Sequence, residues 1–165
     1  MKVIYLAAGY GKLKYKNVIY QDKYIKRDIG GDMLDVDLSK YQILLASPPC
    51  NYYSKANRVY LTSKYSLDTK HLLPNIINNF SKTFKPFIVE NVINKKRMID
   101  IINNFNGFYY EIGRHSYFTN IMFNLSNIKF KPCNIKYLSK KQRQGCGGVN
   151  EIFDYFIKYI MECEL

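Results

Sequence analysis

Short apolar runs recur along the chain, and each ends at a glycine, a proline or a polar residue. Four of them predict buried strands: Lys2–Ala8, Val18–Gln21, Tyr41–Ala46 and Pro86–Val89. Runs that are apolar throughout, without polar alternation, are typical of strands covered on both faces in a parallel sheet. The first half of the chain is therefore expected to build a mostly parallel sheet.

Segments with helical spacing lie between and after these strands. Leu67–Phe84 carries apolar residues three and four positions apart, and Pro74 is expected to kink this helix or to mark its true start. Two further helices are expected over Lys95–Phe105 and Ile152–Met161. Strands and helices that alternate in this way predict a doubly wound α/β fold, in a single domain over residues 1–165.

Two connections in this pattern are unusual. Only Lys12–Asn17 separates the first glycine-containing loop from the second strand, whereas a parallel crossover takes about a dozen residues or more. Either the first crossover helix is almost deleted or the first strand is misplaced. Later in the chain, Phe108–Ile112 and Phe118–Leu125 predict two strands joined by Gly113–Tyr117.

The charge of the chain narrows the class of its partners. It has 165 residues and a net charge of +12, from 25 basic and 13 acidic side chains. This excess favours a polyanion such as nucleic acid, although a basic proteome or a solubility device gives the same balance. Heavy use of Lys, Asn, Ile and Tyr is typical of an AT-rich coding genome such as that of a virus.

The cysteines and the apolar runs bear on metal, membrane and compartment. No two of the four cysteines stand in a CxxC spacing, so no metal site is expected. The start of the chain does not match a signal peptide, and no run approaches the ~18 apolar residues that span a bilayer. We expect free thiols in the cytoplasm of a prokaryotic host cell, and no membrane partner.

Polar residues gather where the predicted strands end, which is where ligands bind in open α/β sheets. Two prolines precede Cys50 and restrict the backbone, so its thiol is expected on a rigid turn. The polar and small residues at these strand ends are Gly9, Gly11, Asp22, Asp32, Pro48, Pro49, Cys50, Glu90 and Asn91.

Two of these clusters carry a family resemblance. SPPCNYYS (Ser47–Ser54) resembles the PPC-x-x-[FY]-S catalytic loop of the DNA cytosine-5 methyltransferases, and VENV (Val89–Val92) resembles their ENV motif. The motifs stand in the family's order, each after an apolar strand. The resemblance implies a Rossmann-like S-adenosylmethionine-dependent methyltransferase fold, with a doubly wound, mostly parallel sheet and an antiparallel C-terminal strand. The short connection before the second strand adds the expectation of a truncated first crossover helix.

The resemblance implies catalytic roles for four residues: Cys50, Glu90, Asn91 and Arg114. Cys50 would add to C6 of cytosine, so that C5 can attack an electrophilic methyl group, and Glu90 would act as a general acid at N3. Asn91 would hold the loop, and Arg114 would support the target base. The ordinary alternatives are a small buried thiol for Cys50 and an ion pair or a helix-cap neighbour for Glu90. They are a helix cap for Asn91 and a structural salt bridge for Arg114.

The resemblance also implies a site for S-adenosylmethionine. LAAGYG (Leu6–Gly11) resembles the family's FxGxG loop, with Ala7 in place of the phenylalanine and Tyr5 in place of the preceding aspartate. Asp22 would bind the ribose hydroxyls and Asp32 the adenine amino group, although both equally suit turns. The residues expected to contact the cofactor are Ala8, Gly9, Gly11, Asp22, Asp32, Pro48 and Asn150.

Asn150 belongs to RQGCGGVNE (Arg143–Glu151), which loosely resembles the family's final GN-x-V motif, and a plain helix cap is the competing interpretation. The family's target-recognition domain has no counterpart, because only Asn127–Gln142 is available for it. A partner chain could supply recognition. The residues expected to contact nucleic acid are Tyr53, Ser54, Lys55, Arg58, Lys140, Lys141 and Arg143.

The sequence thus predicts an enzyme that methylates C5 of cytosine, in DNA first of all. A cytosine-5 methyltransferase acting on tRNA shares both motifs. A catalytically inactive, methyltransferase-like protein that binds nucleic acid, or an enzyme acting on a free nucleotide, would explain the missing recognition region.

Overall fold

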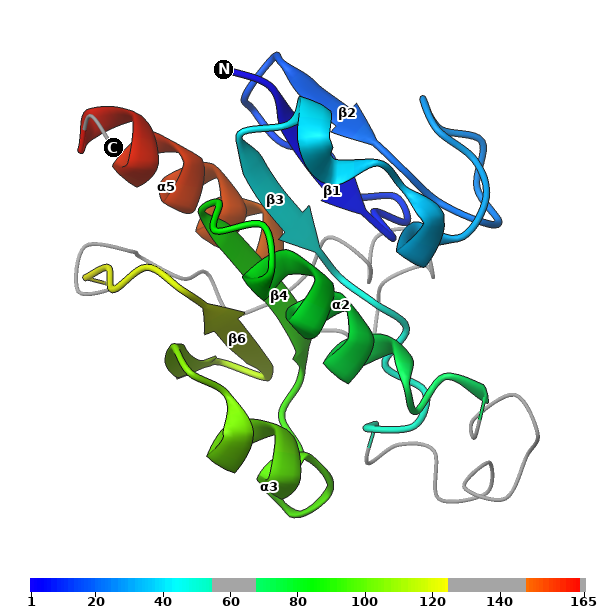
Figure 1. Ribbon diagram of the computed structural model, residues 1–165, viewed down its shortest axis with the longest axis vertical. Coiled ribbons are helices and arrows are strands. Elements are labelled where there is room, and N and C mark those ends of the chain that lie inside the picture. Colours follow the sequence, from blue (N-terminus) through cyan, green and yellow to red (C-terminus); the bar gives the residue numbers. More distant parts are fainter. Residues whose placement is uncertain (55–67, 125–147, 164–165) are drawn as a thin grey trace, which may run out of the picture.

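The computed structural model describes residues 1–54, 68–124 and 148–163, and within them it contains one six-stranded sheet in the order β2-β1-β3-β4-β6-β5 (Figure 1). Neighbours among the first four strands pair in parallel, and β6 pairs antiparallel with both β4 and β5. The strands are β1 (Val3–Leu6), β2 (Val18–Tyr20), β3 (Ile43–Ala46), β4 (Phe87–Val92), β5 (Phe108–Ile112) and β6 (His115–Thr119). The mostly parallel α/β sheet with antiparallel strands toward the C-terminus is confirmed.

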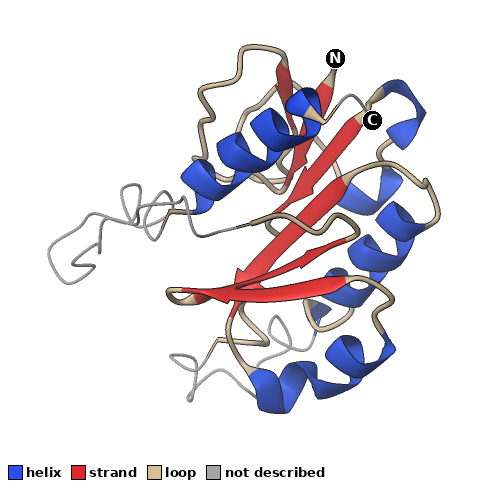
Figure 2. Cartoon of the chain, turned by 90° about the vertical axis from the view of Figure 1, so that its left-hand side faces the viewer, coloured by secondary structure: helices blue, strands red, loops and turns tan. Residues whose placement is uncertain are grey.

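Helices lie on both sides of this twisted sheet (Figure 2). Successive residues of β1 face opposite sides, so Val3 and Tyr5 pack with one apolar cluster, and Ile4 and Leu6 pack with the other. The continuous apolar run of this strand is therefore explained by burial on both faces.

Three α-helices occur in the described residues. α2 (Leu72–Ser81) buries residues 73, 76, 77 and 80, and α5 (Val149–Glu162) buries residues at the same three- and four-residue spacing along its length. α3 (Lys95–Asn104) buries only Met98. Pro74 lies in the first turn of α2, where backbone N–H groups have no partner within the helix, so the missing N–H of proline removes no hydrogen bond. Pro74 therefore marks the start of this helix and does not kink it. No helix in these ranges is long and apolar enough to cross a membrane.

The expected loss of the first crossover helix is confirmed. The connection between β1 and β2 contains no helix, and its Leu13 joins the apolar cluster that includes α5. The carboxylate of Asp154 in α5 accepts hydrogen bonds from the backbone N–H groups of Lys14, over 2.9 and 3.1 Å, and of Tyr15, over 3.3 Å. The C-terminal helix thus covers part of the face that a crossover helix would otherwise cover.

The predicted strand Phe118–Leu125 is wrong at both ends. β6 begins at His115, directly after a turn at Gly113 and Arg114, and it ends at Thr119. Its first residues are polar because they pair with the polar end of β4: Ser116 lies opposite Asn91, and its hydroxyl donates to the Asn91 carbonyl over 3.1 Å. The apolar pattern alone therefore placed this strand three residues too late.

Candidate active site

The loop after β3 is fixed by backbone and side-chain hydrogen bonds. The Ser47 N–H donates to the Leu6 carbonyl over 3.1 Å, so the loop leaves the sheet beside β1. Pro48 is buried, and its carbonyl accepts a 3.1 Å hydrogen bond from the side-chain amide of Asn91. Asn91 is 1% exposed and holds the loop, as expected from the sequence.

Cys50 follows on a tight turn. The N–H groups of Tyr53 and Ser54 both donate to its carbonyl, over 3.0 and 2.8 Å, so the backbone reverses directly after the thiol. Burial, and then the negative charge of Glu90, raise the pKa of the Cys50 thiol to about 11. The thiol is therefore protonated at neutral pH, and the Glu90 carboxylate lies close enough to affect it.

Glu90 lies in β4, almost fully buried, on the face of the sheet that α5 covers. Its Oε1 lies 2.5 Å from Nδ1 of His115 in β6. Tyr117 is its direct cross-strand partner, and burial, together with the charge of Glu90, raises the pKa of the Tyr117 phenol. A carboxyl group, a thiol and an imidazole therefore gather at the carboxyl ends of two neighbouring strands.

The loop after β1 has a strained start and a tightly packed end. Ala7 and Gly9 both have a positive φ, of 50° and 53°, which costs a non-glycine residue about 1 kcal/mol. Gly11 is required by packing: a Cβ there would lie 2.9 Å from the Ala8 carbonyl oxygen and 2.9 Å from the Tyr5 ring. The strain at Ala7 is notable because this residue lines a cavity.

Two side chains that the sequence did not single out hold this loop. Arg27 donates from Nε and Nη2 to the Gly9 carbonyl, over 2.9 and 2.5 Å, and from Nη2 to the Gly11 carbonyl, over 2.9 Å. Gln21 is fully buried; its Oε1 accepts from the Ala7 N–H, and its Nε2 donates to the Gly31 carbonyl. Their role depends on contacts across the fold, and no local motif marks it.

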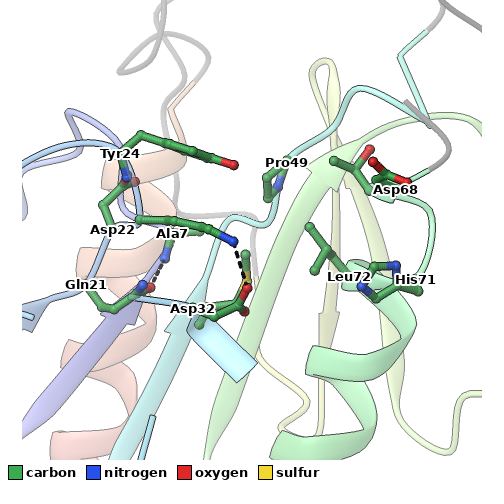
Figure 3. A pocket seen from close by; sticks show the side chains of 12 residues that line it. Ala7, Gln21, Asp22, Tyr24, Asp32, Pro49, Asp68, His71 and Leu72 are labelled. Carbon is green, nitrogen blue, oxygen red and sulfur yellow. Dashed lines mark hydrogen bonds and ion pairs between the residues drawn. The ribbon is translucent and has the colours of Figure 1, made fainter. Parts of the chain in front are cut away.

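A cavity of about 320 Å³ opens beside this loop. Figure 3 shows Gln21 and Asp32 on one side and His71 and Leu72 on the other, with Pro49 between them. Its size lies at the lower end of the roughly 300–1,000 Å³ usual for small-molecule sites. The residues that line it are Ala7, Gln21, Asp22, Lys23, Tyr24, Asp32, Met33, Pro49, Asp68, Thr69, His71 and Leu72.

Both predicted cofactor carboxylates line this cavity, and both also have structural partners. Asp22 accepts from the N–H groups of Gly9, Tyr24 and Ile25 over 2.8–3.0 Å. Asp32 caps the 3₁₀ helix η1 (Met33–Asp35) and pairs with Lys23 over 3.2 Å. The hydrogen bond from the Leu34 N–H is the main reason that the pKa of Asp32 is lowered. The turn roles foreseen for these residues are therefore present, together with a cavity that a ligand could enter.

Two buried polar atoms near the N-terminus of α5 have no hydrogen-bond partner among the described residues. They are the phenolic oxygen of Tyr117 and Oδ1 of Asn150. Asn150 lies against the glycine loop, since a Cβ on Gly11 would lie 3.3 Å from its Oδ1. Unpaired buried acceptors and donors are costly, so each of these atoms is expected to take a partner such as an ordered water molecule or a polar ligand.

The structure separates the predicted residues into four groups. Cys50, Glu90 and Asn91 come together, and Ala8, Gly9, Gly11, Asp22, Asp32, Pro48 and Asn150 lie along the loops at the same edge of the sheet. Arg114 is exposed on the turn before β6, and its neighbour His115 is the residue that contacts Glu90. Lys55, Arg58, Lys140, Lys141 and Arg143 lie outside the described residues.

The role expected for Tyr53 is corrected. This side chain is 2% exposed and belongs to the apolar cluster around α2, and its hydroxyl donates to the Lys70 carbonyl over 2.9 Å. Its ring is not available to stack on a base. The aromatic spacing gave no means of separating a buried tyrosine from an exposed one. Ser54, next to it, is partly exposed beside the Cys50 turn.

His115 is the main residue that the sequence did not identify. It follows a glycine turn and has no motif around it, and its contact with Glu90 depends on the antiparallel register of β4 and β6.

A scan against protein-family models and a search of curated proteins found no match for this chain.

Proposed function

We propose that this protein is a methyltransferase that transfers a methyl group from S-adenosylmethionine to C5 of cytosine in nucleic acid, with DNA as the first candidate. The observation that carries the proposal is that Cys50, on the loop after β3, and Glu90, in β4, come together near the carboxyl ends of two neighbouring strands. The charge of Glu90 contributes to the raised pKa of the thiol, and Asn91, the next residue, holds the loop that carries it. This arrangement supports a nucleophile and an acid at the same edge of the sheet.

The order of the strands supports this proposal. Cys50 follows β3 and Glu90 lies in β4, and these strands are parallel neighbours at the centre of the sheet. Ligands bind outside the carboxyl ends of the strands in open α/β sheets. The antiparallel strand β6 lies between β4 and β5, and this also agrees with the Rossmann-like methyltransferase fold that the motifs imply.

The side chains present suit the proposed chemistry. Cys50 would lose its proton and form a bond from sulfur to C6 of the base. Glu90 would donate a proton or a hydrogen bond to N3, where negative charge develops. S-adenosylmethionine, when bound, supplies an electrophilic methyl group for C5. Loss of the C5 proton to solvent, return of the N3 proton to Glu90 and cleavage of the S–C6 bond would then restore the aromatic ring, and the Cys50 thiolate would regain from solvent the proton that it gave up.

The cavity beside the glycine loop fits part of such a cofactor. Asp22 and Asp32 offer carboxylate oxygens, while Met33, Pro49 and Leu72 offer apolar surface. Acceptors beside an apolar wall suit a nucleoside, whose hydroxyl and amino groups donate and whose base is flat and apolar on its faces.

One observation favours a second candidate. A thiol with a pKa of about 11 is a weak nucleophile at neutral pH, as expected for an inactive methyltransferase-like protein that binds nucleic acid through its charge of +12. In the enzyme, binding of the base must lower this pKa. An adduct assay therefore separates the two candidates.

The test uses oligonucleotides that contain 5-fluorocytosine, together with labelled S-adenosylmethionine. The fluorine cannot leave as the C5 proton does, so an enzyme is expected to remain covalently attached through Cys50. Single-stranded DNA, duplex DNA and tRNA carrying the analogue distinguish the nucleic acid used. Cys50→Ala should form no adduct, whereas Cys163→Ala, which removes an exposed cysteine, should form it normally. Wild-type protein that forms no adduct with any of the three would refute the proposal.

A further inference from the structure

The partner of Glu90 across the sheet is a histidine, which has no part in the mechanism so far. Nδ1 of His115 lies 2.5 Å from Oε1 of Glu90, and the two side chains are 19% and 11% exposed. His115 pairs with Val92, two residues beyond Glu90, so both side chains lie on the same face as diagonal neighbours. The contact therefore follows from the register of the sheet.

We infer that His115 is a positioning residue: it binds one carboxyl oxygen of Glu90 and directs the other toward Cys50 and the ring that adds to it. This inference rests on the function proposed above. A carboxyl group that acts as a general acid carries its proton on one oxygen, so the other oxygen, Oε1, accepts in this contact and Nδ1 of His115 carries the hydrogen. Oε2 is then left for N3 of the base.

The other groups that face Glu90 do not replace this contact. Tyr117 and Tyr5 both sense the charge of Glu90, and burial raises the pKa of both phenols, so both are neutral. The Tyr5 hydroxyl interacts with the Ser47 hydroxyl over 3.0 Å, and the Tyr117 hydroxyl has no partner among the described residues. His115 thus makes the hydrogen bond that fixes the carboxyl group.

Cys50 reports on this arrangement without any methyl transfer. The charge of Glu90 contributes to the high pKa of the thiol, so a carboxyl group that is free to turn toward solvent should affect the thiol less. Loss of the histidine should therefore lower the pKa of Cys50, and only while residue 90 is a glutamate. This dependence distinguishes positioning through Glu90 from a general loosening of the fold.

The experiment measures the rate at which iodoacetamide alkylates Cys50 as a function of pH, by mass spectrometry of its peptide. His115→Phe keeps a ring without a donor, His115→Ala removes the ring, and His115→Gln keeps an N–H donor. The first two should lower the pKa of Cys50, and a thiol pKa that is lower by about one raises alkylation at a fixed pH about tenfold. His115→Gln should stay close to wild type. In the Glu90→Gln background, removal of the histidine should change nothing further.

The rate of methyl transfer provides a second readout. His115→Phe should lower kcat and leave KM for S-adenosylmethionine unchanged, while Glu111→Gln, on the neighbouring strand, should change neither. Titration of Cys50 that is unaffected by loss of His115, or affected equally with and without Glu90, would overturn the positioning role. A wild-type protein that forms no adduct would overturn the methyltransferase proposal instead, so the two failures are distinct.

Discussion

The side-chain amide of Asn91 donates a hydrogen bond to the carbonyl oxygen of Pro48 over 3.1 Å, and so joins the end of β4 to the loop that carries Cys50. Both groups are buried. Asn91→Ala would leave the carbonyl without a partner, at a cost of about 1–3 kcal/mol in the free energy of unfolding. Urea denaturation measures this loss.

A matched control exists in α3. The amide of Asn104 also donates to a backbone carbonyl, that of Asp100, over 2.7 Å, but this pair is exposed. Asn104→Ala is expected to cost less than about 0.5 kcal/mol, because water replaces the bond. If both variants lost the same stability, the bond to Pro48 would not be what holds the loop that carries Cys50.

The raised pKa of Cys50 predicts a loss of stability at alkaline pH. Its value of about 11 in the folded protein lies above that of an exposed thiol, so the unfolded chain ionises first. The stability contributed by the protonated thiol is complete below about pH 8 and is lost as pH rises toward 11. Cys50→Ala and Cys50→Ser should therefore lose about 1 kcal/mol less than wild type between pH 8 and pH 10.

Comparison with these two variants removes the contribution of the tyrosines, which titrate in all three proteins. Chemical denaturation at each pH gives the free energies. Parallel curves for the three proteins would show that the thiol is not desolvated in the folded state, and the tight turn at Cys50 would then need another description.

Two aspartates with the same local role separate cofactor binding from folding. Asp32 caps η1 and Asp37 caps η2 (Leu38–Lys40), each by accepting from an N–H two residues on, and each pairs with a lysine. Only Asp32 lines the cavity. Asp32→Asn should weaken binding of S-adenosylmethionine about tenfold, because a charged acceptor is lost, while Asp37→Asn should not.

Calorimetry with the cofactor measures both affinities. Both variants keep a capping oxygen, so their thermal midpoints should remain close to wild type. Equal affinity in Asp32→Asn and wild type would exclude the cavity beside the glycine loop as the place where the nucleoside binds.

The sequence predicted the central sheet well because its strands are buried on both faces. Ile43–Ala46 and Phe87–Val92 have apolar runs that no solvent-exposed strand would need, and a candidate catalytic group follows the first strand and another lies near the end of the second. Parallel strands bring such groups to one edge without any further information. The local sequence pattern was therefore enough to predict Cys50 and Glu90 as candidate site residues.

The residues that contact these side chains and the neighbouring loops could not be predicted from the local pattern. His115 reaches Glu90 through antiparallel register, and Arg27 reaches the carbonyls of Gly9 and Gly11 from a loop that has no apolar periodicity. Tyr53 was expected to contact nucleic acid, but its side chain is buried beside α2. Contacts of this kind depend on how distant elements pack, which a local pattern does not encode.

The last prediction concerns the contact between α5 and the connection from β1 to β2, which contains no crossover helix. Asp154 accepts from the backbone N–H groups of Lys14 and Tyr15, and so fastens the C-terminal helix to the connection between β1 and β2. Asp154→Ala removes the acceptor of one exposed and one partly buried N–H group, which water replaces in part, and should cost about 0.5–1.5 kcal/mol. Asp154→Asn keeps an oxygen acceptor and removes a partly buried charge, whose burial raises the pKa of Asp154, so it should retain most of the stability. Hydrogen exchange of the Lys14 and Tyr15 amides should accelerate in the alanine variant alone, and if α5 does not secure this connection, both variants will exchange as slowly as wild type.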